Sequence, residues 1–287
     1  MKTGIVILNY NDFESTYNML NKIKDYKELD LIVIVDNNSS DNSYSKLKEI
    51  ENTKIKVIKT DRNLGYAYGN NYGLKYLQDK DIDYVIISNP DVIVSENTIK
   101  ELKKDLTRSD ITLVAPKVLE GNTYSKGWKL PKFKEELVSN MTYFHKYSQK
   151  MLSYSSDYYN KDLVEVEVVH GCFFMIKYQE FKNINFFDPN TFLYYEENIL
   201  GKKLKNNNLK TFIDTRLEVK HMLSVSVNKS INSIKKYKIL KQSQFYYEKQ
   251  YNKLNIFGLC LLRLFYYISL GVSYIHVFKK SIERRRT

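Results

Sequence analysis

Cysteine is scarce in this sequence, and its scarcity excludes several classes of protein. The 287 residues contain two cysteines, Cys172 and Cys260, which lie far apart and match neither a zinc site nor a redox motif. The N-terminus lacks a charged segment followed by an apolar one, so nothing there resembles a secretory signal. We therefore expect a cytosolic protein with reduced thiols. A hydrophobic content of 43% is ample for a globular core.

Acidic residues are almost absent from residues 228–287. This segment has thirteen lysines and arginines but only two glutamates, Glu248 and Glu283. Because the formal net charge of the whole chain is +12, the first 227 residues are close to neutral. The basic charge therefore belongs to a tail. We expect the partner of this tail to be an anionic surface, either nucleic acid or anionic lipid.

A long uninterrupted apolar run is also missing. Residues 256–278 are apolar and long enough to cross a bilayer, but Arg263 interrupts them and tyrosines crowd them. An arginine in the middle of a membrane span costs about 2.5 to 3.5 kcal/mol. We therefore expect one helix or a helical pair that lies in the membrane interface, with basic flanks on anionic lipid. The alternatives are a helical cap on the body and an oligomer contact, such as that of a homodimer.

The first 98 residues alternate between buried strands and helices. Short β-branched runs, typical of strands buried on both faces of a sheet, occupy residues 3–8, 31–35, 54–58 and 85–87. A short polar loop and a helical pattern follow each run. This order predicts an α/β fold with a doubly wound, mostly parallel sheet. The four loops then lie at the carboxyl edge of the sheet, where ligands bind in such folds.

The pattern of the second half is looser. We expect aromatic and polar surface structure without a clear period over residues 121–159, forming a mobile flap. Around it we expect short strands and one helix: strands over 112–115 (ending at Pro116), 164–169, 211–213 and 217–219, and a helix that residues 192–198 open and that continues to 204.

Asp91 stands at the carboxyl edge of the fourth strand. The preceding Ser88, Asn89 and Pro90 end this strand, because proline has no N–H for the ladder and fixes the turn. A carboxylate at this edge is well placed to hold a hard divalent cation against phosphate oxygens. The alternative is that Asp91 only caps the helix that starts near Ser95.

Asp36 ends the second strand and gives a second candidate site. Its carboxylate is placed to bind a pyrimidine ring or a ribose that lies over the edge of the sheet, with Asn9 and Tyr10 lining the same pocket. The alternative is an ordinary Asx-turn, which the loop DNNSSDNS can form in several ways.

The loop before the third helix contains Arg62, Asn63 and Gly65. The helix itself contains Asn70 among several small or polar residues that are poor helix formers. Close approach of a ligand explains such residues, and so does crowded packing between chain segments. Both alternatives stay open.

Glu196 and Glu197 are adjacent carboxylates at the start of a helix, after four mostly aromatic residues. The helix dipole favours acidic residues there for structural reasons. An aromatic wall is also how a general base acquires a pKa near neutrality. His221 follows the last expected strand, where it is either a structural residue or a metal ligand.

Seven motifs in one order give the sequence a family resemblance over residues 3–226. The chain resembles the family 2, GT-A, inverting glycosyltransferases, especially the rhamnosyltransferase-like branch of bacterial polysaccharide biosynthesis. The motifs are IVILNYN, VIVDNNSSD, DRNLGYAYGNNYG, ISNPDV, VHGCFFMIK, FLYYEENILGKKLK and KHMLSVS.

The resemblance implies roles for individual residues. Asp36 contacts the nucleotide base or ribose, and Asn89 and Asp91 stand where the family has its metal-binding DXD motif. Because Asn89 replaces the first aspartate, coordination of Mn²⁺ or Mg²⁺ rests mainly on Asp91, and His221 matches a late histidine that holds metal or diphosphate. The remaining donor-binding residues are Asn9, Tyr10, Arg62, Asn63, Gly65 and Asn70.

The resemblance also implies a reaction. Glu197, beside Glu196, matches the catalytic aspartate of the family, with a side chain one methylene longer. It would deprotonate an acceptor hydroxyl, which attacks the anomeric carbon opposite the leaving nucleoside diphosphate and inverts its configuration. Ile199 replaces a second acidic residue often found in this turn. Three further residues are candidates for the acceptor side: Trp128, His170 and Gly171.

These inferences together give a complete hypothesis. Residues 1–227 are a GT-A domain, with a nucleotide-binding half (1–98) and an acceptor and catalytic half (99–227), and residues 228–287 are the membrane-associating helical tail. The donor is dTDP-rhamnose or a UDP-hexose, and the acceptor is a lipid-linked saccharide in capsule, O-antigen or exopolysaccharide assembly. The enzyme would be peripheral, on the cytoplasmic face of the membrane.

Two other functions compete with this hypothesis. Asn89, Glu197 and Ile199 depart from the family pattern, and these departures motivate a catalytically inactive module that binds a nucleotide sugar or a glycan. Binding of the basic tail to DNA or RNA would make its association sensitive to salt. We expect no nucleic-acid partner.

Overall fold

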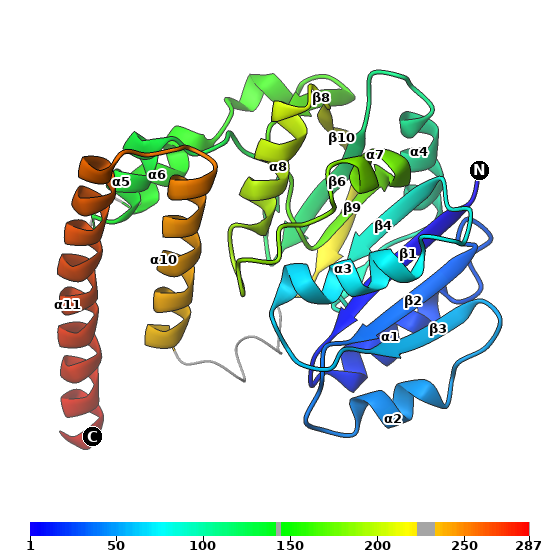
Figure 1. Cartoon of the computed structure of the whole chain (residues 1–287), viewed down its shortest axis with the longest axis horizontal. Helices are drawn as coiled ribbons and strands as arrows, with labels where there is room; N and C mark the ends of the chain where they lie inside the picture. Colours follow the sequence, from blue (N-terminus) through cyan, green and yellow to red (C-terminus); the bar gives the residue numbers. More distant parts are fainter. Residues whose placement is uncertain (142–144, 223–232, 287) are drawn as a thin grey trace.

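A computed structural model describes residues 1–141, 145–222 and 233–286, except for the side chains of 145–146, 233 and 273–286. Residues 223–226 of the last motif and the arginines near the C-terminus therefore lie outside what is described. The body is built on a ten-stranded mixed sheet whose main path runs β3-β2-β1-β4-β9-β6-β10-β5 (Figure 1).

The first half of the sheet is parallel, as its alternating pattern predicts. Each strand pairs in parallel with its neighbours, and the register aligns Asn9 with Asp36 at the carboxyl edge. The strands are β1 (Thr3–Asn9), β2 (Leu31–Asp36), β3 (Ile55–Lys59) and β4 (Tyr84–Ser88), and the helices between them are α1 (Phe13–Ile23), α2 (Ser43–Lys48) and α3 (Tyr66–Tyr76). The predicted α/β class and doubly wound sheet are confirmed.

The second half makes the sheet mixed. Strand β9 (Phe173–Lys177) runs antiparallel between β4 and β6 (Leu113–Glu120), and β6 pairs in parallel with β10 (Thr211–His221). Three short strands are antiparallel to their neighbours: β5 (Val92–Ile93) and β8 (Leu163–Val166) pair with β10, and β7 (Thr123–Ser125) pairs with β6.

Helices cover both faces of the sheet because successive strand residues point to opposite faces. In β1, Ile5 and Ile7 pack in one buried cluster with residues of α1, α2 and α4 (Glu96–Leu106). Val6 packs in a second cluster with α3, α7 (Tyr178–Asn183) and α8 (Glu196–Asn206). This sandwich leaves the carboxyl edge of the sheet open between the helices.

Pro116 does not end a strand, contrary to our expectation. It lies inside β6, opposite Asp214, just where the β6–β10 register shifts between Asp214 and Glu218. A proline without an N–H is tolerated at such an irregularity. Strand β6 continues past Pro116 to Glu120. Residues 211–213 and 217–219, which were expected as two strands, belong to the single strand β10.

The expectation of irregular structure over residues 121–159 is also wrong. This segment contains α5 (Phe133–Ser139), α6 (His145–Leu152) and a short 3₁₀ helix, η1 (Ser156–Tyr159), besides β7. Helix α5 has a capping interaction at its start, where Lys132 N donates to Glu135 Oε2 over 3.1 Å. Helices α5 and α6 lie beside the C-terminal helices, away from the sheet (Figure 1).

The tail forms two helices beside the body, α10 (Ser233–Gln250) and α11 (Ile256–Arg286) (Figure 1). The inner face of α10 is buried and includes Gln244, Tyr247 and Glu248. Helix α10 thus packs on the body, whereas the alternatives stated for residues 256–278 concern α11. Within the described parts of the chain, no helix has the length and apolar character needed to cross a membrane.

Candidate active site

Side chains from three segments meet at the carboxyl edge of the sheet. Asp91 lies between β4 and β5, Glu120 ends β6 and His221 ends β10. Strand pairing aligns them, because His221 pairs with Val92 on one side and with Glu120 on the other. His221 Nδ1 lies 2.6 Å from Glu120 Oε1, and its Nε2 lies 3.2 Å from Asp91 Oδ1. One histidine therefore bridges two carboxylates.

His170 and Cys172 complete this cluster from the segment before β9. His170 Nε2 lies 3.2 Å from Glu120 Oε1, and the rings of His170 and His221 meet edge to face with their centroids 5.6 Å apart. The backbone N–H of Asn89 donates to the carbonyl of Cys172 over 2.8 Å. Ligating atoms of His170, Cys172 and His221 all lie within 4.8 Å of one another.

The electrostatics of the cluster favour charged carboxylates beside the imidazoles. The hydrogen bond with His170 and then that with His221 lower the pKa of Glu120 to about 2, although burial opposes them. Burial lowers the pKa of His221, but Asp91 and Glu120 outweigh it and raise this pKa above its usual value. Burial raises the pKa of the Cys172 thiol well above its usual range, which disfavours the thiolate.

These residues fit a divalent cation. Asp91 Oδ2 is buried and has no hydrogen-bond partner among the described residues, and His221 Nε2 lies 3.2 Å from the other oxygen, Oδ1. A buried polar atom without a partner is costly, so a ligand beside these two side chains best explains Asp91 Oδ2. Carboxylate oxygen and imidazole nitrogen are ligands that suit Mn²⁺, whereas Mg²⁺ prefers oxygen.

Glu196 and Glu197 begin α8 beside this cluster. The two residues before them, Tyr194 and Tyr195, have φ of 72° and 71°, a left-handed conformation that is strained for side chains other than glycine. The strain turns the chain sharply, so that Glu197 lies over Gly171; a Cβ placed on Gly171 would come within 2.7 Å of Glu197 Oε1.

The two glutamates have different surroundings. Glu196 is 5% exposed, and its Oε1 has no hydrogen-bond partner in the described structure. Burial, and then the neighbouring Glu197, raise the pKa of Glu196 well above its usual range. The Tyr66 hydroxyl donates to the Gly171 carbonyl over 2.7 Å beneath this pair. Burial and then Glu197 raise the pKa of this phenol, so Tyr66 is a neutral donor.

Gly65 serves chain packing. Its φ is 102°, and a Cβ there would lie 1.9 Å from the carbonyl oxygen of Phe192. The N–H of Tyr66 donates to this same carbonyl over 3.0 Å, which fixes the start of α3 against the loop before α8. Gly69 and Gly73 likewise admit side chains of β1 and β2. Crowded packing, one of the two open alternatives, therefore explains these glycines.

Asp36 is fully buried and forms the turn that its sequence allows. Its two carboxylate oxygens accept from Asn9 Nδ2 and from Ser39 N, each over 2.9 Å. Asn37, which we did not single out, joins the neighbouring loop by donating to Asn63 Oδ1 over 3.0 Å and to the Gly65 carbonyl over 3.1 Å. The Asp36 carboxylate, held by Asn9 and Ser39, thus lies beside the loop that Asn37 fixes at the ends of β1 and β2.

The remaining predicted site residues lie around this edge. Tyr10 is half-buried beyond β1, and Arg62 is exposed in the loop after β3. Asn70 is buried in α3, where its Nδ2 donates to the Tyr66 carbonyl over 3.0 Å. The Trp128 indole donates to Asn198 Oδ1 over 2.8 Å, and its ring lies edge to face with His170, 6.4 Å between centroids.

The profile of the family described as Glycosyl transferase family 2 matches residues 4–184 of this sequence. The chain belongs to this family. The resemblance inferred from the seven motifs is thus confirmed at the level of the family. The match ends before Glu197 and His221, so the roles of these two residues remain predictions.

A curated relative supports the same conclusion. The low-salt glycan biosynthesis hexosyltransferase Agl10 of Haloferax volcanii is 27% identical to this chain over 196 residues. The alignment covers 68% of this chain but 58% of Agl10, so the family 2 chain described here spans less than two thirds of that relative's length.

Solved structures of glycosyltransferases share the fold. GalNAc-T7 with UDP, GalNAc and Mn²⁺ superimposes with a TM-score of 0.58 at 16% identity, covering 77% of this chain and 44% of GalNAc-T7. The mannosyltransferase PcManGT of Pyrobaculum calidifontis, in complex with GDP-Man and Mn²⁺, gives a TM-score of 0.58 at 11% identity over 98% of this chain and 75% of PcManGT. These similarities establish the GT-A fold.

Glu120 and Asn198 are candidate functional residues that sequence reasoning missed. A proline at position 116 predicts the end of the strand, so Glu120 falls outside every strand and helix expected from the sequence. Cys172 was considered only for spacing to the other cysteine, although it follows His170 by two residues. The alternation of His170 and Cys172 along the chain was the available signal.

Proposed function

We propose that this chain transfers a sugar from a nucleoside-diphosphate sugar to a hydroxyl of a lipid-linked saccharide, with inversion at the anomeric carbon. The observation that carries the proposal is the position of Glu197 beside the cluster of Asp91, Glu120 and His221 at the ligand-binding edge of the sheet. TarS of S. aureus has been solved with UDP-GlcNAc and PcManGT with GDP-Man. For this chain, dTDP-rhamnose and UDP-hexoses are the donors to test.

Each group in the cluster has a role in this proposal. Asp91 and His221 would hold a divalent cation, Mn²⁺ or Mg²⁺, which supplies positive charge against the departing diphosphate. Glu120 orients His221 through its hydrogen bond to Nδ1, as carboxylates do for metal-binding histidines. The side chains of Asp36 and Asn9 would contact the nucleoside.

Glu197 would take the proton from the attacking hydroxyl. The carboxylate lies over Gly171, whose missing side chain leaves room for it, and the backbone there is held by Tyr66. The hydroxyl oxygen then attacks the anomeric carbon from the face opposite the leaving diphosphate, so a single displacement inverts the configuration. Correct placement of such a base contributes about 10² to 10⁴ in rate.

The exposed surface of helix α11 is an argument for an acceptor bound to a membrane. Phe257, Leu261, Leu264 and Ile268 follow one another at spacings of four, three and four residues, so they lie on one face of the helix. Their side chains are 38–83% exposed. An exposed apolar face on a segment rich in lysine and arginine fits the interface of an anionic bilayer. We propose that α11 holds the enzyme peripherally on the cytoplasmic face of the membrane.

Donor binding gives the first test. A panel of nucleoside diphosphates and nucleotide sugars is titrated into wild type and Asp91→Ala, with Mn²⁺, with Mg²⁺ and with chelator. We expect binding of one nucleotide class that requires metal and is lost in Asp91→Ala. Asp12→Ala, in the loop after β1, is the matched control for removal of one carboxylate. Absence of binding by wild type under every condition would overturn the donor assignment.

Flotation with liposomes tests the membrane proposal separately. We expect wild type to float with vesicles of phosphatidylcholine and phosphatidylglycerol, but not with phosphatidylcholine alone. Leu261→Ser combined with Leu264→Ser should abolish flotation. Equal flotation of this variant would show that the apolar face of α11 does not bind lipid. A gel shift with duplex DNA checks that the basic tail does not bind nucleic acid instead.

A further inference from the structure

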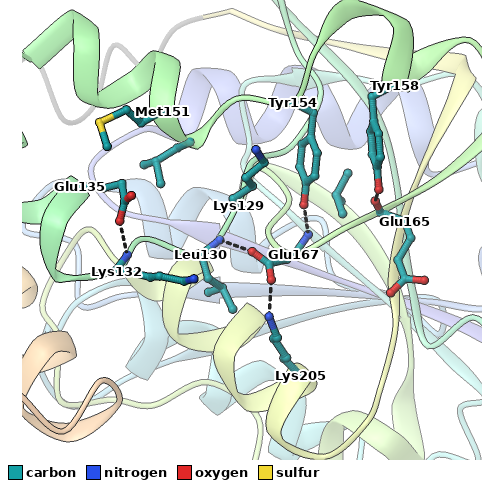
Figure 2. A pocket seen from close by; sticks show the side chains of 12 residues that line it. Lys129, Leu130, Lys132, Glu135, Met151, Tyr154, Tyr158, Glu165, Glu167 and Lys205 are labelled. Atoms are coloured by element: carbon teal, nitrogen blue, oxygen red, sulfur yellow. Dashed lines mark hydrogen bonds and ion pairs between the residues drawn. The ribbon is translucent and has the colours of Figure 1, made fainter.

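A cavity of about 580 Å³ lies apart from the cluster of Asp91, Glu120 and His221 (Figure 2). Its walls come from the segment before α5, from α6 and the residues after it, from β8 and from the end of α8. The lining side chains are Lys129, Leu130, Lys132, Glu135, Met151, Leu152, Tyr154, Tyr158, Glu165, Val166, Glu167 and Lys205. A volume in this range accommodates a small ligand, and the mixture of aromatic, cationic and anionic side chains is polar.

Two chain segments connect this cavity to the active site. Trp128 and Val168 form a β-bridge, with mutual backbone hydrogen bonds of 3.0 Å. Trp128 reaches Asn198 and His170 on the active-site side, whereas its neighbour Lys129 lines the cavity. The active site and the cavity therefore share the strands that form one of their walls.

Helix α8 also spans both sites. It carries Glu197 at its first turn and Lys205 near its last turn. At 1.5 Å per residue these positions are about 12 Å apart along the helix axis. A saccharide of more than one unit, with its reacting hydroxyl at Glu197, is long enough to extend in the direction of the cavity.

The carboxylates of the cavity are already engaged. Glu167 accepts from Leu130 N over 2.7 Å and pairs with Lys205, while Glu135 Oε2 accepts from Lys132 N over 3.1 Å. Glu165 pairs with Lys210 over 3.2 Å. These contacts neutralise the acidic side chains or fix them to the backbone (Figure 2).

Lys129 and Lys132 are two further cationic residues that line the same cavity. Neither Lys129 nor Lys132 has an ion-pair partner among the described residues, and Lys129 Nζ lies 5.4 Å from the centroid of the Tyr154 ring. Tyr154 stacks on Tyr158 with centroids 4.5 Å apart. Their hydroxyls are held by the backbone, because Glu167 N donates to Tyr154 and Tyr158 donates to the Glu165 carbonyl. A rigid aromatic wall thus lies beside the Lys129 ammonium group, and Lys132 lines the same cavity.

We propose that this cavity is a subsite for the acceptor, which binds an anionic sugar unit of the saccharide through Lys129 and Lys132. The inference rests on the proposed function, because it takes the ligand to be part of the acceptor. The anionic group is a phosphate or a carboxylate carried by the sugar. The stacked rings of Tyr154 and Tyr158 hold the Lys129 side chain at the cavity wall, where its ammonium group meets the anion.

Trp128 provides a direct readout of binding. It is the single tryptophan of the chain and precedes Lys129 in sequence. Glucose 6-phosphate, glucuronic acid and glucose are titrated into the full chain while tryptophan fluorescence is recorded, with UDP and Mn²⁺ present at saturating concentration to occupy the donor site. We expect a saturable change with at least one anionic sugar and none with glucose.

Charge-matched variants test the assignment. Lys129→Met combined with Lys132→Met should weaken the anionic sugar at least tenfold. Lys22→Met combined with Lys24→Met removes the same charge from the exposed face of α1 and should leave affinity unchanged. The ratio of affinities for the phosphate and the carboxylate sugar identifies the group that is bound. Retained thermal melting of both double variants verifies that they fold.

Either of two results would overturn the proposal: no saturable change with any anionic sugar, or equal weakening in both double variants. Failure of the proposed function is distinguishable, because donor binding is measured separately with Asp91→Ala. A chain that binds anionic sugars at Trp128 but no nucleotide would retain the cavity site and lose the transferase mechanism. In that case the same titration is run without UDP and Mn²⁺.

Discussion

Tyr195 donates its phenol hydrogen to Glu136 over 2.6 Å and thereby joins the loop before α8 to α5. Gln244 of α10 donates to the same carboxylate, and Ser243 donates to the Leu193 carbonyl over 2.8 Å. Tyr195 is also the left-handed residue immediately before the two glutamates of α8. The C-terminal helix α10 therefore holds the strained turn that presents Glu197.

Tyr195→Phe should lower catalysis more than it lowers stability. Loss of this hydrogen bond leaves a buried group of Glu136 less satisfied, which costs about 1 to 3 kcal/mol, and it frees the turn before Glu197. We expect kcat to fall about tenfold with unchanged donor affinity. Tyr237→Phe is the matched control, because its hydroxyl bonds Ser269 between α10 and α11. A loss of kcat that is equal in both variants would refute a role specific to the loop before α8.

Gly171→Ala should displace the proposed base without unfolding the protein. The added Cβ would meet Glu197 Oε1 at 2.7 Å and Cγ at 3.0 Å, both belonging to a side chain that is able to move. A displacement of about 1 Å in a reacting group can cost about 10² in rate. We expect this loss in kcat together with a nearly unchanged melting temperature. Full activity of the alanine variant would show that Glu197 does not work from this position.

The parallel half of the sheet could be read from the sequence because its strands are continuous β-branched runs followed by polar loops. The site around Glu120 could not. A proline usually ends a strand, and only the irregularity opposite Pro116 in β10 lets β6 continue. That irregularity depends on contacts between segments about one hundred residues apart, which local patterns do not contain.

The start of α8, with Glu196 and Glu197, shows a similar limit of prediction from the sequence. Its position at a helix start was evident from the sequence, but the two left-handed tyrosines before it were not, because neither is a residue type that favours that conformation. The conformation is imposed by tertiary contacts to α5 and α10. The function of α10 as a support for the loop was therefore beyond sequence reasoning, whereas its basic character was plain.

Glu197→Gln should remove the general base and leave the affinity for the donor unchanged. Glutamine has the same shape but cannot accept the hydroxyl proton, so kcat should fall by about 10² to 10⁴. Glu196→Gln serves as the comparison, because burial and then Glu197 raise the pKa of Glu196, which disfavours its charged form. We expect this second variant to lose much less activity. Unchanged activity of Glu197→Gln would remove Glu197 as the base.

Asp105→Asn should stabilise the protein at alkaline pH. Burial, followed by the nearby Asp214, raises the pKa of Asp105 to about 7, against about 3.9 for an unfolded aspartate. The folded state therefore resists ionisation, and the stability present below the unfolded pKa is lost as pH rises through about 7. We expect the melting temperature of the variant, relative to wild type, to increase from pH 5 to pH 8.

Asp110→Asn is the control for this pH dependence. Asp110 is exposed, and its hydrogen bond with Arg108 lowers its pKa, so the sign of its contribution is opposite. The difference between this variant and wild type should not grow in favour of asparagine from pH 5 to pH 8. An Asp105→Asn curve parallel to wild type at every pH would contradict the raised pKa.

Glu120→Gln should weaken metal binding although Glu120 is not itself an expected ligand. Its carboxylate bonds His221 Nδ1 at 2.6 Å and so fixes the ring that directs Nε2 toward Asp91. Loss of such a supporting carboxylate typically costs 10-fold to 100-fold in metal affinity. Electron paramagnetic resonance of free Mn²⁺, in the presence of UDP, measures this affinity without requiring activity. Glu218→Gln, an exposed neighbour on β10, should bind Mn²⁺ as wild type does, and His221→Gln should bind it least. Wild-type affinity in Glu120→Gln would mean that Glu120 does not position His221 for the cation.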